Sequence, residues 1–241
     1  MEGITLSKPY ESYESGDYLA KNPSWDEEDS VWKANQVLKV LDKNHLKPKT
    51  IIEVGCGAGG VLASLHDTLP NVKYFGVDIA ADARKFWVKH AAKRITFSVG
   101  NFLQLQTARS DLMLLLDVIE HIPNPFEFLT QLKGRSDYYI FHIPLDLSSI
   151  SVLRETPLLF VRNKVGHIHY FTKSLALSLL YECDYEVIDW SYTNASFSNK
   201  SGGIKKIFSR IVRGFFYYLN KDLGVRLCGG ETLIVLAKSK S

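Results

Sequence analysis

The chain has 241 residues, of which 46% are hydrophobic and 23% charged, and it carries a net charge of +3 and three cysteines. These values are typical of one globular domain, and so small a charge gives no support to a nucleic-acid-binding function. The sequence shows no signal-peptide pattern, no apolar run long enough to span a bilayer and no metal-type cysteine spacing. We therefore expect a single cytoplasmic domain with free thiols.

The first 48 residues form a distinct N-terminal part. Residues 1–29 are polar and show no clear period, and a helical pattern begins at about Asp29. We expect 1–48 to be an arm and a helix that cover the binding site of the main domain, which comprises 49–241. The apolar positions of this helix are Val31, Trp32, Ala34, Val37, Leu38 and Leu41.

After Pro48, short apolar runs alternate with helical stretches. This alternation predicts an α/β fold in which a mostly parallel, doubly wound sheet is covered by helices on both faces. Ligands of such sheets bind beyond the carboxyl ends of the strands, so the residues that follow each strand are the functional candidates. The expected strands are 50–54, 73–77, 95–99, 111–116, 138–143, 185–193 and 231–237. The expected helices are 59–68, 81–92, 125–134 and 173–182.

A glycine-rich turn follows the first strand in the segment TIIEVGCGAGGVL. Gly55, Gly57 and Gly60 satisfy the pattern G-x-G-x-x-G, in which backbone N–H groups and a helix N-terminus approach a ligand closely. The pattern fits a dinucleotide or S-adenosylmethionine, and it also occurs in purely structural turns. Glu53 favours S-adenosylmethionine, because a carboxylate would repel a pyrophosphate but would pair with a sulfonium and an ammonium group.

Four motifs in chain order resemble those of class I S-adenosylmethionine-dependent methyltransferases, in particular the small-molecule branch that includes the quinone O-methyltransferases. They are IIEVGCGAG at 51–59, YFGVDI at 74–79, SVGNF at 98–102 and DLMLLLDVIEHI at 111–122. The resemblance implies a Rossmann-like sheet of seven strands, mostly parallel with an antiparallel last strand. It also implies methyl transfer from S-adenosylmethionine to a small-molecule acceptor, through a hydroxyl oxygen.

The resemblance also implies roles for the side chains at the strand ends. Asp78 would hold the ribose hydroxyls, and Asn101, where the family often has Asp, would bind the adenine amino group. Each position has a structural alternative, since Asp78 could cap the next helix, Asn101 could cap a turn and Phe102 could belong to the core. The implied cofactor-binding residues are Glu53, Gly55, Cys56, Gly57, Gly59, Asp78, Ile79, Asn101, Phe102 and Asp117.

Histidines near strand ends are candidates for the general base that an acceptor hydroxyl needs. We expect His121 in this role, with His142 and His167 as alternatives. His121 could instead fix its turn through a backbone hydrogen bond, and His142 could be a buried core histidine. His167 and His169 alternate in the segment GHIHYFT, so at most one of them is expected to face the site if that segment is extended.

The spacing of Asp117, Glu120 and His121 raises the alternative of a divalent cation held by oxygen and nitrogen ligands. The sequence resembles the quinone-biosynthesis branch at this point, where such a cluster implies a metal. Because many relatives use the same residues as scaffold, we expect no metal here.

The acceptor is less constrained than the cofactor. The fourth strand is followed by DVIE instead of an NPPY-type motif, so a nucleic-acid base is not expected. A quinone-like, sugar or lipid-linked acceptor remains open. A basic amphipathic helix expected at 203–219, within a helical insertion at 195–228, would pack on the sheet, form a lid or touch a membrane surface.

Two rival functions also remain open. One is an NAD-dependent oxidoreductase, which the glycine pattern would suit. The other is a catalytically silent methyltransferase-like binding or scaffold protein.

Overall fold

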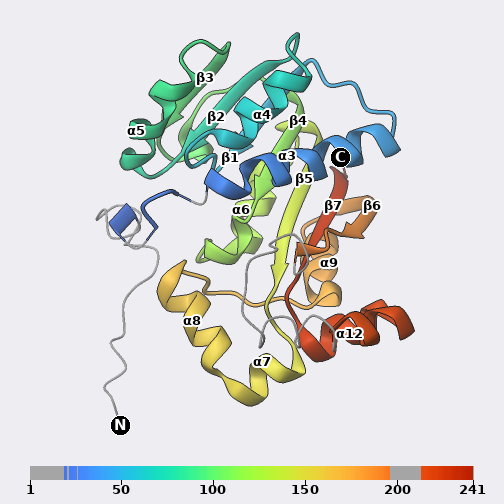
Figure 1. The fold of residues 1–241 in the computed structure, drawn as a ribbon. Coiled ribbons are helices and arrows are strands. Elements are labelled where there is room, and N and C mark those ends of the chain that lie inside the picture. The colour runs from blue at the N-terminus through green and yellow to red at the C-terminus, as the bar shows by residue number, and fades with distance from the viewer. Residues whose placement is uncertain (1–18, 21, 26, 196–212, 241) are drawn as a thin grey trace.

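A single seven-stranded sheet forms the centre of the computed structural model, which describes residues 19–240 except 21, 26 and 196–212 (Figure 1). The strand order is β3-β2-β1-β4-β5-β7-β6, and the pairs are parallel except for the two that involve β7. All seven expected strands and the antiparallel last strand are confirmed. The strands are β1 Thr50–Val54, β2 Lys73–Asp78, β3 Ile95–Val99, β4 Ser110–Leu116, β5 Ser136–Leu145, β6 Tyr185–Tyr192 and β7 Glu231–Ser239.

Helices cover both faces of the sheet because the central strands are apolar on both sides. Along β4, Met113 and Leu115 pack into one core layer, while Leu112 and Leu114 pack into the other. The first layer lies under α6 and α9, and the second lies under α3 and α4. These helices are α3 Ser30–Lys43, α4 Gly60–Thr68, α6 Pro125–Leu132 and α9 Lys173–Glu182.

The helix expected at 81–92 is present, but it is irregular and alternates between 3-10 and α-helical turns. The segment forms three short turns: η2 Ala81–Ala83, α5 Arg84–Trp87 and η3 Val88–His90. Neither α5 nor η3 has a buried residue, and Val88 is 77% exposed. Without an apolar stripe to bury, the segment lacks the packing that stabilises a long regular helix.

Three helices lie together beyond the carboxyl end of β5 (Figure 1). They are α7 Ser149–Arg154, α8 Thr156–Lys164 and α12 Lys221–Cys228. Most of the helix expected at 203–219 lies outside the residues that the structure describes. Its last part, 213–219, is described and is helical. Within the described part of the chain, no helix is long and apolar enough to cross a membrane.

Three short 3-10 turns carry residues near the site. η1 Glu27–Asp29 directly precedes α3, whereas η4 Phe102–Gln104 follows β3 and η5 Ile119–His121 follows β4.

Candidate active site

A cavity of about 420 Å³ lies at the carboxyl ends of β1, β2 and β4, under the start of α3. This is the edge at which a doubly wound sheet binds its ligands. Gly59 and His142 are not among the lining residues. The expected site residues that do line the cavity are Glu53, Gly55, Cys56, Gly57, Asp78, Ile79, Asn101, Phe102, Asp117, His121 and His167.

The glycine turn is packed so tightly that larger side chains would not fit. Gly57 has φ +49°, and a Cβ added there would lie 2.7 Å from the Trp25 ring. A Cβ on Gly55, which has φ +76°, would lie 2.7 Å from Val118. The backbone N–H groups of Gly55 and Cys56 donate to the Val77 carbonyl, which fixes the turn against β2.

Two expected residues of this turn act through the fold and not through side-chain chemistry. Gly59 is the N-terminal cap residue of α4. Burial raises the pKa of the Cys56 thiol well above its usual value, and the nearby Asp78 and Glu53 carboxyls act in the same direction. The thiol therefore stays neutral, as expected for a small packing side chain.

Glu53 is a buried acid at the end of β1. Its side chain is 2% exposed, and among the described residues its Oε2 atom has no hydrogen-bond partner. Burial raises the pKa of Glu53 to about 8; Lys33 opposes this effect and Asp78 reinforces it. A buried acid without a partner is costly when charged, so the carboxyl stays protonated at neutral pH unless a cationic group enters the cavity.

Asp78 joins the glycine turn to the end of β2. Its Oδ2 accepts from the Gly57 N–H at 2.7 Å, and its Oδ1 accepts from the Ala80 N–H at 2.8 Å. Burial raises the pKa of Asp78, while these two backbone hydrogen bonds lower it. Each carboxyl oxygen can still accept another hydrogen bond, so the structural role of Asp78 does not compete with ligand binding.

Asn101 and Phe102 also combine structural contacts with a place in the cavity wall. The Asn101 Oδ1 accepts from the Leu103 N–H at 3.0 Å and caps η4, so the side-chain amide N–H₂ is the group it can offer to a ligand. Phe102 is 2% exposed, and the Arg135 guanidinium lies 5.3 Å from the centre of its ring. Asn101 therefore caps a turn and Phe102 belongs to the core, as the structural alternatives for these two residues predict.

Asp117 lies at the centre of a charged network. Its Oδ2 pairs with the Lys33 ammonium at 2.8 Å, and its Oδ1 accepts from His142 Nδ1 at 2.7 Å. Burial alone would raise the pKa of Asp117, but Lys33 and His142 hold it well below its usual range. The carboxylate is therefore ionised and held in place before any ligand arrives.

His142 lies behind Asp117, away from the cavity. It is 3% exposed and packs edge-on against the Trp32 ring. This position favours the alternative of a buried core histidine. Lys33, which lines the cavity from α3, was missed because one lysine in an amphipathic helix gives no local sign of its distant partner.

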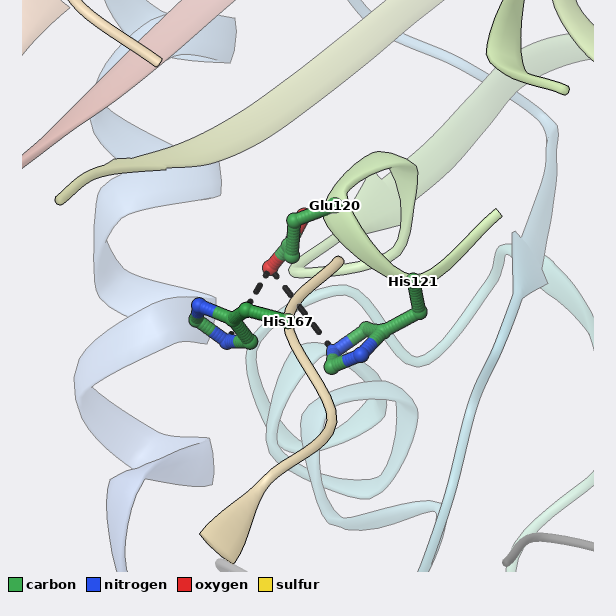
Figure 2. Close-up of side chains that lie close together, drawn as sticks. All are labelled: Glu120, His121 and His167. Carbon is green, nitrogen blue, oxygen red and sulfur yellow. Dashed lines mark ion pairs between the residues drawn. The ribbon is translucent and has the colours of Figure 1, made fainter. Parts of the chain in front are cut away.

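Glu120, His121 and His167 form a cluster at the cavity wall (Figure 2). Glu120 is fully buried, and neither of its carboxyl oxygens has a hydrogen-bond partner among the described residues. The Nε2 atoms of both histidines lie 3.9 Å from the Glu120 Oε1 (Figure 2). Three ligand-type atoms of this cluster lie within 4.8 Å of one another, so the group could hold a metal ion.

The other nitrogen of each ring fixes its orientation. His121 Nδ1 donates to the Gly166 carbonyl at 3.1 Å, and His167 Nδ1 lies 2.6 Å from the Asp146 carboxylate. Burial and the neighbouring His167 lower the pKa of His121 to about 4, so this imidazole is neutral at neutral pH. Asp146 was missed by the sequence analysis because its partner lies 21 residues away.

His167 and His169, two residues apart in the same loop, have different surroundings. His167 lines the cavity, whereas His169 is directed to the Ile122 carbonyl at 2.9 Å, so only one of the pair faces the site. The cation alternative based on Asp117, Glu120 and His121 has the wrong third member. In the described part of the chain the cluster contains His167, because Asp117 is engaged by Lys33 and His142.

Most of the chain matches a known protein family. A family model described as a methyltransferase domain matches residues 29–189, about two thirds of the chain. The matched region includes α3 and the carboxyl ends of β1, β2 and β4, whereas Trp25 and Thr232, which also line the cavity, lie outside it. The match therefore covers most of the candidate site and not an isolated motif.

A relative of known activity is also a methyltransferase. A ubiquinone biosynthesis O-methyltransferase from Glaesserella parasuis is 30% identical over 101 residues, which are 38% of this chain and 42% of that relative. The match therefore spans less than half the length of that protein.

Solved structures extend the likeness to the whole fold. The plantazolicin methyltransferase BpumL, solved with a monoazolic desmethylPZN analog and S-adenosylhomocysteine (SAH), has a TM-score of 0.60 at 16% identity, with 97% of this chain and 95% of that one covered. The N-methyltransferase NodS from Bradyrhizobium japonicum, solved with SAH, has a TM-score of 0.61 at 13% identity, with 98% of this chain and all of that one covered. Identities this low show a common fold and leave the acceptor open.

Proposed function

Because the chain belongs to the methyltransferase-domain family, as a class I enzyme that depends on S-adenosylmethionine, we propose that its acceptor is a hydroxyl oxygen of a small molecule. Family membership removes the NAD-dependent oxidoreductase as a rival. The observation that carries the oxygen assignment is the placement of two oriented histidines beside Glu120 at the cavity wall. A hydroxyl must lose its proton as it is methylated, and oriented imidazoles are suited to accept it.

The cofactor would occupy the end of the cavity formed by β1 and β2. Bound S-adenosylmethionine supplies the electrophilic methyl group. Glu53 would pair with its positive charge, and Asp78 would accept hydrogen bonds from the ribose hydroxyls. Ile79 and Phe102 would flank the adenine, with the Asn101 amide donating to a ring nitrogen. The support for this orientation is the unpartnered Glu53 Oε2 atom, which burial leaves in need of a cationic partner.

The N-terminal part would complete the cofactor site. We retain the division into an arm and helix at 1–48 and a methyltransferase domain at 49–241. Trp25 and Lys33, both from the first part, line the cavity and support this arrangement. The ionised Asp117 would keep the Lys33 ammonium at a defined place in the wall.

We assign the general base to His167 in preference to His121, which reverses the order expected from the sequence. Asp146 accepts from His167 Nδ1, so a carboxylate would stabilise the positive charge that this ring gains with a proton. The carbonyl partner of His121 offers less stabilisation, and burial already disfavours its charged form. His121 would then orient the acceptor hydroxyl.

A second candidate mechanism follows from Glu120. A fully buried carboxyl with two unpartnered oxygens and two imidazoles beside it has the donor set of a divalent-cation site. Asp146 would then be the outer partner that orients His167, as carboxylates do for many metal-bound histidines. In this alternative the three residues would bind the acceptor oxygen through the ion.

Labelled methyl transfer to a panel of acceptors tests the proposal. The panel contains hydroxylated aromatic compounds, sugars and the matching amines, each with and without a chelator. Transfer to a hydroxyl that His167→Asn abolishes is the expected result, and sensitivity to the chelator would select the cation mechanism. Transfer to amines alone would refute the oxygen assignment. Cofactor binding without turnover on any acceptor would support the silent binding protein.

A further inference from the structure

Exposed apolar side chains are concentrated on two short stretches, 149–164 and 213–228. Of the sixteen large hydrophobic side chains that are exposed in the described part of the chain, nine lie in these stretches. Leu153 is 85% exposed, Phe160 60% and Tyr218 90%. Isolated exposed apolar residues need no explanation, but such a concentration indicates a surface that another apolar phase covers.

The two stretches form one surface, which we call the α7–α12 surface. Helix α12 packs against α7, and α8 follows α7 directly (Figure 1). The Tyr217 hydroxyl donates to the Gly229 carbonyl. Gly229 in turn lies close to Ser148, the cap residue of α7, and a Cβ added to Gly229 would lie 2.8 Å from the Ser148 Oγ. The exposed apolar side chains are therefore held on a fixed support.

The charge of the α7–α12 surface sets it apart from the rest of the chain. Its two stretches contain six basic residues and two acidic ones, whereas the remaining sequence contains 23 basic and 24 acidic residues. One of the two acids, Asp222, already pairs with Lys173. The six basic residues are Arg154, Arg162, Lys164, Arg213, Lys221 and Arg226.

Exposed apolar side chains together with an excess of basic residues indicate what binds the α7–α12 surface. A protein partner or a second copy of the chain would be expected to cover apolar side chains with few charges at the centre. Apolar side chains interspersed with lysine and arginine instead suit an anionic bilayer, in which the former enter the acyl boundary and the latter contact headgroups.

The α7–α12 surface also adjoins the candidate active site. Helix α8 ends at Lys164, and the next residues include Gly166, which holds His121, and His167, which lines the cavity. The Lys164 carbonyl accepts from the Asn22 side chain at 3.2 Å, which joins the end of α8 to the N-terminal part. A bilayer in contact with α8 would lie close to the loop that carries the proposed base.

We propose that the α7–α12 surface docks on an anionic lipid bilayer, from which the cavity receives a lipid-type acceptor. The identity of the acceptor rests on the proposed function, whereas the docking itself does not. Binding needs no conformational change in this scheme, because the apolar side chains are already exposed. It should depend jointly on anionic headgroups and on Leu153 and Phe160.

Vesicle co-sedimentation of the full chain tests the docking. The vesicles are phosphatidylcholine alone or phosphatidylcholine with about one third phosphatidylglycerol, at low and high salt. The expected result is binding to the anionic vesicles only, weakened by salt, and reduced at least about tenfold in the double variant Leu153→Gln with Phe160→Gln. Val88→Gln, which removes an apolar side chain of similar exposure outside the surface, is the matched control and should bind as the parent does.

Several outcomes would overturn the proposal. Equal binding to both vesicle types, or no binding to either, would contradict anionic docking. A dimer in light scattering that the double variant converts to a monomer, without vesicle binding, would show that a second copy covers the surface. Methyl transfer to a water-dispersed acceptor reports separately on the active site, so a failure there would refute the proposed function and leave the docking result standing.

Discussion

Binding of S-adenosylmethionine should release a proton from Glu53. Burial raises the pKa of this carboxyl to about 8, so at pH 7 roughly nine in ten molecules of the cofactor-free protein carry the proton. A cation placed beside Glu53 stabilises the carboxylate and lowers that pKa. We therefore expect close to one proton released per cofactor at pH 7. Between pH 6 and pH 7 the affinity should rise about tenfold, or about 1.4 kcal/mol, because less work is needed to ionise the acid.

Titration calorimetry measures the release directly. The binding enthalpy at pH 7 is compared in two buffers of different ionisation enthalpy, and the difference gives the number of protons. Glu53→Gln keeps the size of the side chain but cannot ionise, so it should abolish the release and weaken binding by about 1–3 kcal/mol. Glu186→Gln, on the exposed face of β6, is the matched control and should leave both quantities unchanged.

A buffer-independent enthalpy in the parent protein would refute this reasoning. It would mean either that Glu53 is already ionised before binding or that it keeps its proton when the cofactor is bound. In both cases the positive charge of the cofactor would be balanced by another group, and our assignment of Glu53 would fail.

The contribution of Glu53 to the stability of the cofactor-free protein should fall as the pH rises from about 4.5 to about 8, since folded Glu53 keeps a proton that the unfolded chain has lost; relative to Glu53→Gln, the parent should therefore lose stability in thermal unfolding across this range. Asp78→Ala should weaken cofactor binding by about 1–3 kcal/mol and also lower the unfolding temperature, since it removes acceptors for two backbone N–H groups; an unchanged affinity in calorimetry would contradict the ribose role. His167→Asn should reduce the turnover rate by about 10²–10⁴-fold, whereas His169→Asn in the same loop should not, and equal losses would contradict the assignment of the base.

The strands and the cofactor end of the site could be predicted because their signals are local. Each strand is a compact apolar run, and a parallel sheet brings the residues that follow its strands to one edge. Glu53, Asp78 and Asn101 were therefore placed near one another without any knowledge of tertiary contacts. The buried, unpartnered state of Glu53 follows from the same pattern, since the residue interrupts an apolar strand.

The partners of the histidines and of Asp117 could not be predicted in this way. Lys33 and Asp117 are 84 residues apart, and nothing in either neighbourhood indicates the other. Helix α8 was missed for a different reason, because it has no fully buried residue and hence no apolar stripe that periodicity could detect. The sequence pattern is informative where side chains face the core, and it fails where a helix faces outward.

The carboxyl groups around the cavity explain how one site can handle a cation and a proton in turn. Asp117 is ionised, because Lys33 and His142 compensate for its burial. Among the described residues, Glu53 Oε2 and both Glu120 oxygens have no hydrogen-bond partner, and burial raises the pKa of both acids. In the cofactor-free protein burial therefore favours the neutral form of Glu53 at the end of β1 and of Glu120 beside His121 and His167. A positively charged cofactor would ionise Glu53, and a protonated histidine or a metal ion would ionise Glu120. Burial keeps each acid neutral until a positive group binds beside it. Replacing Glu53 or Glu120 with glutamine should therefore abolish the ionisation of that residue and leave the ionisation of the other intact.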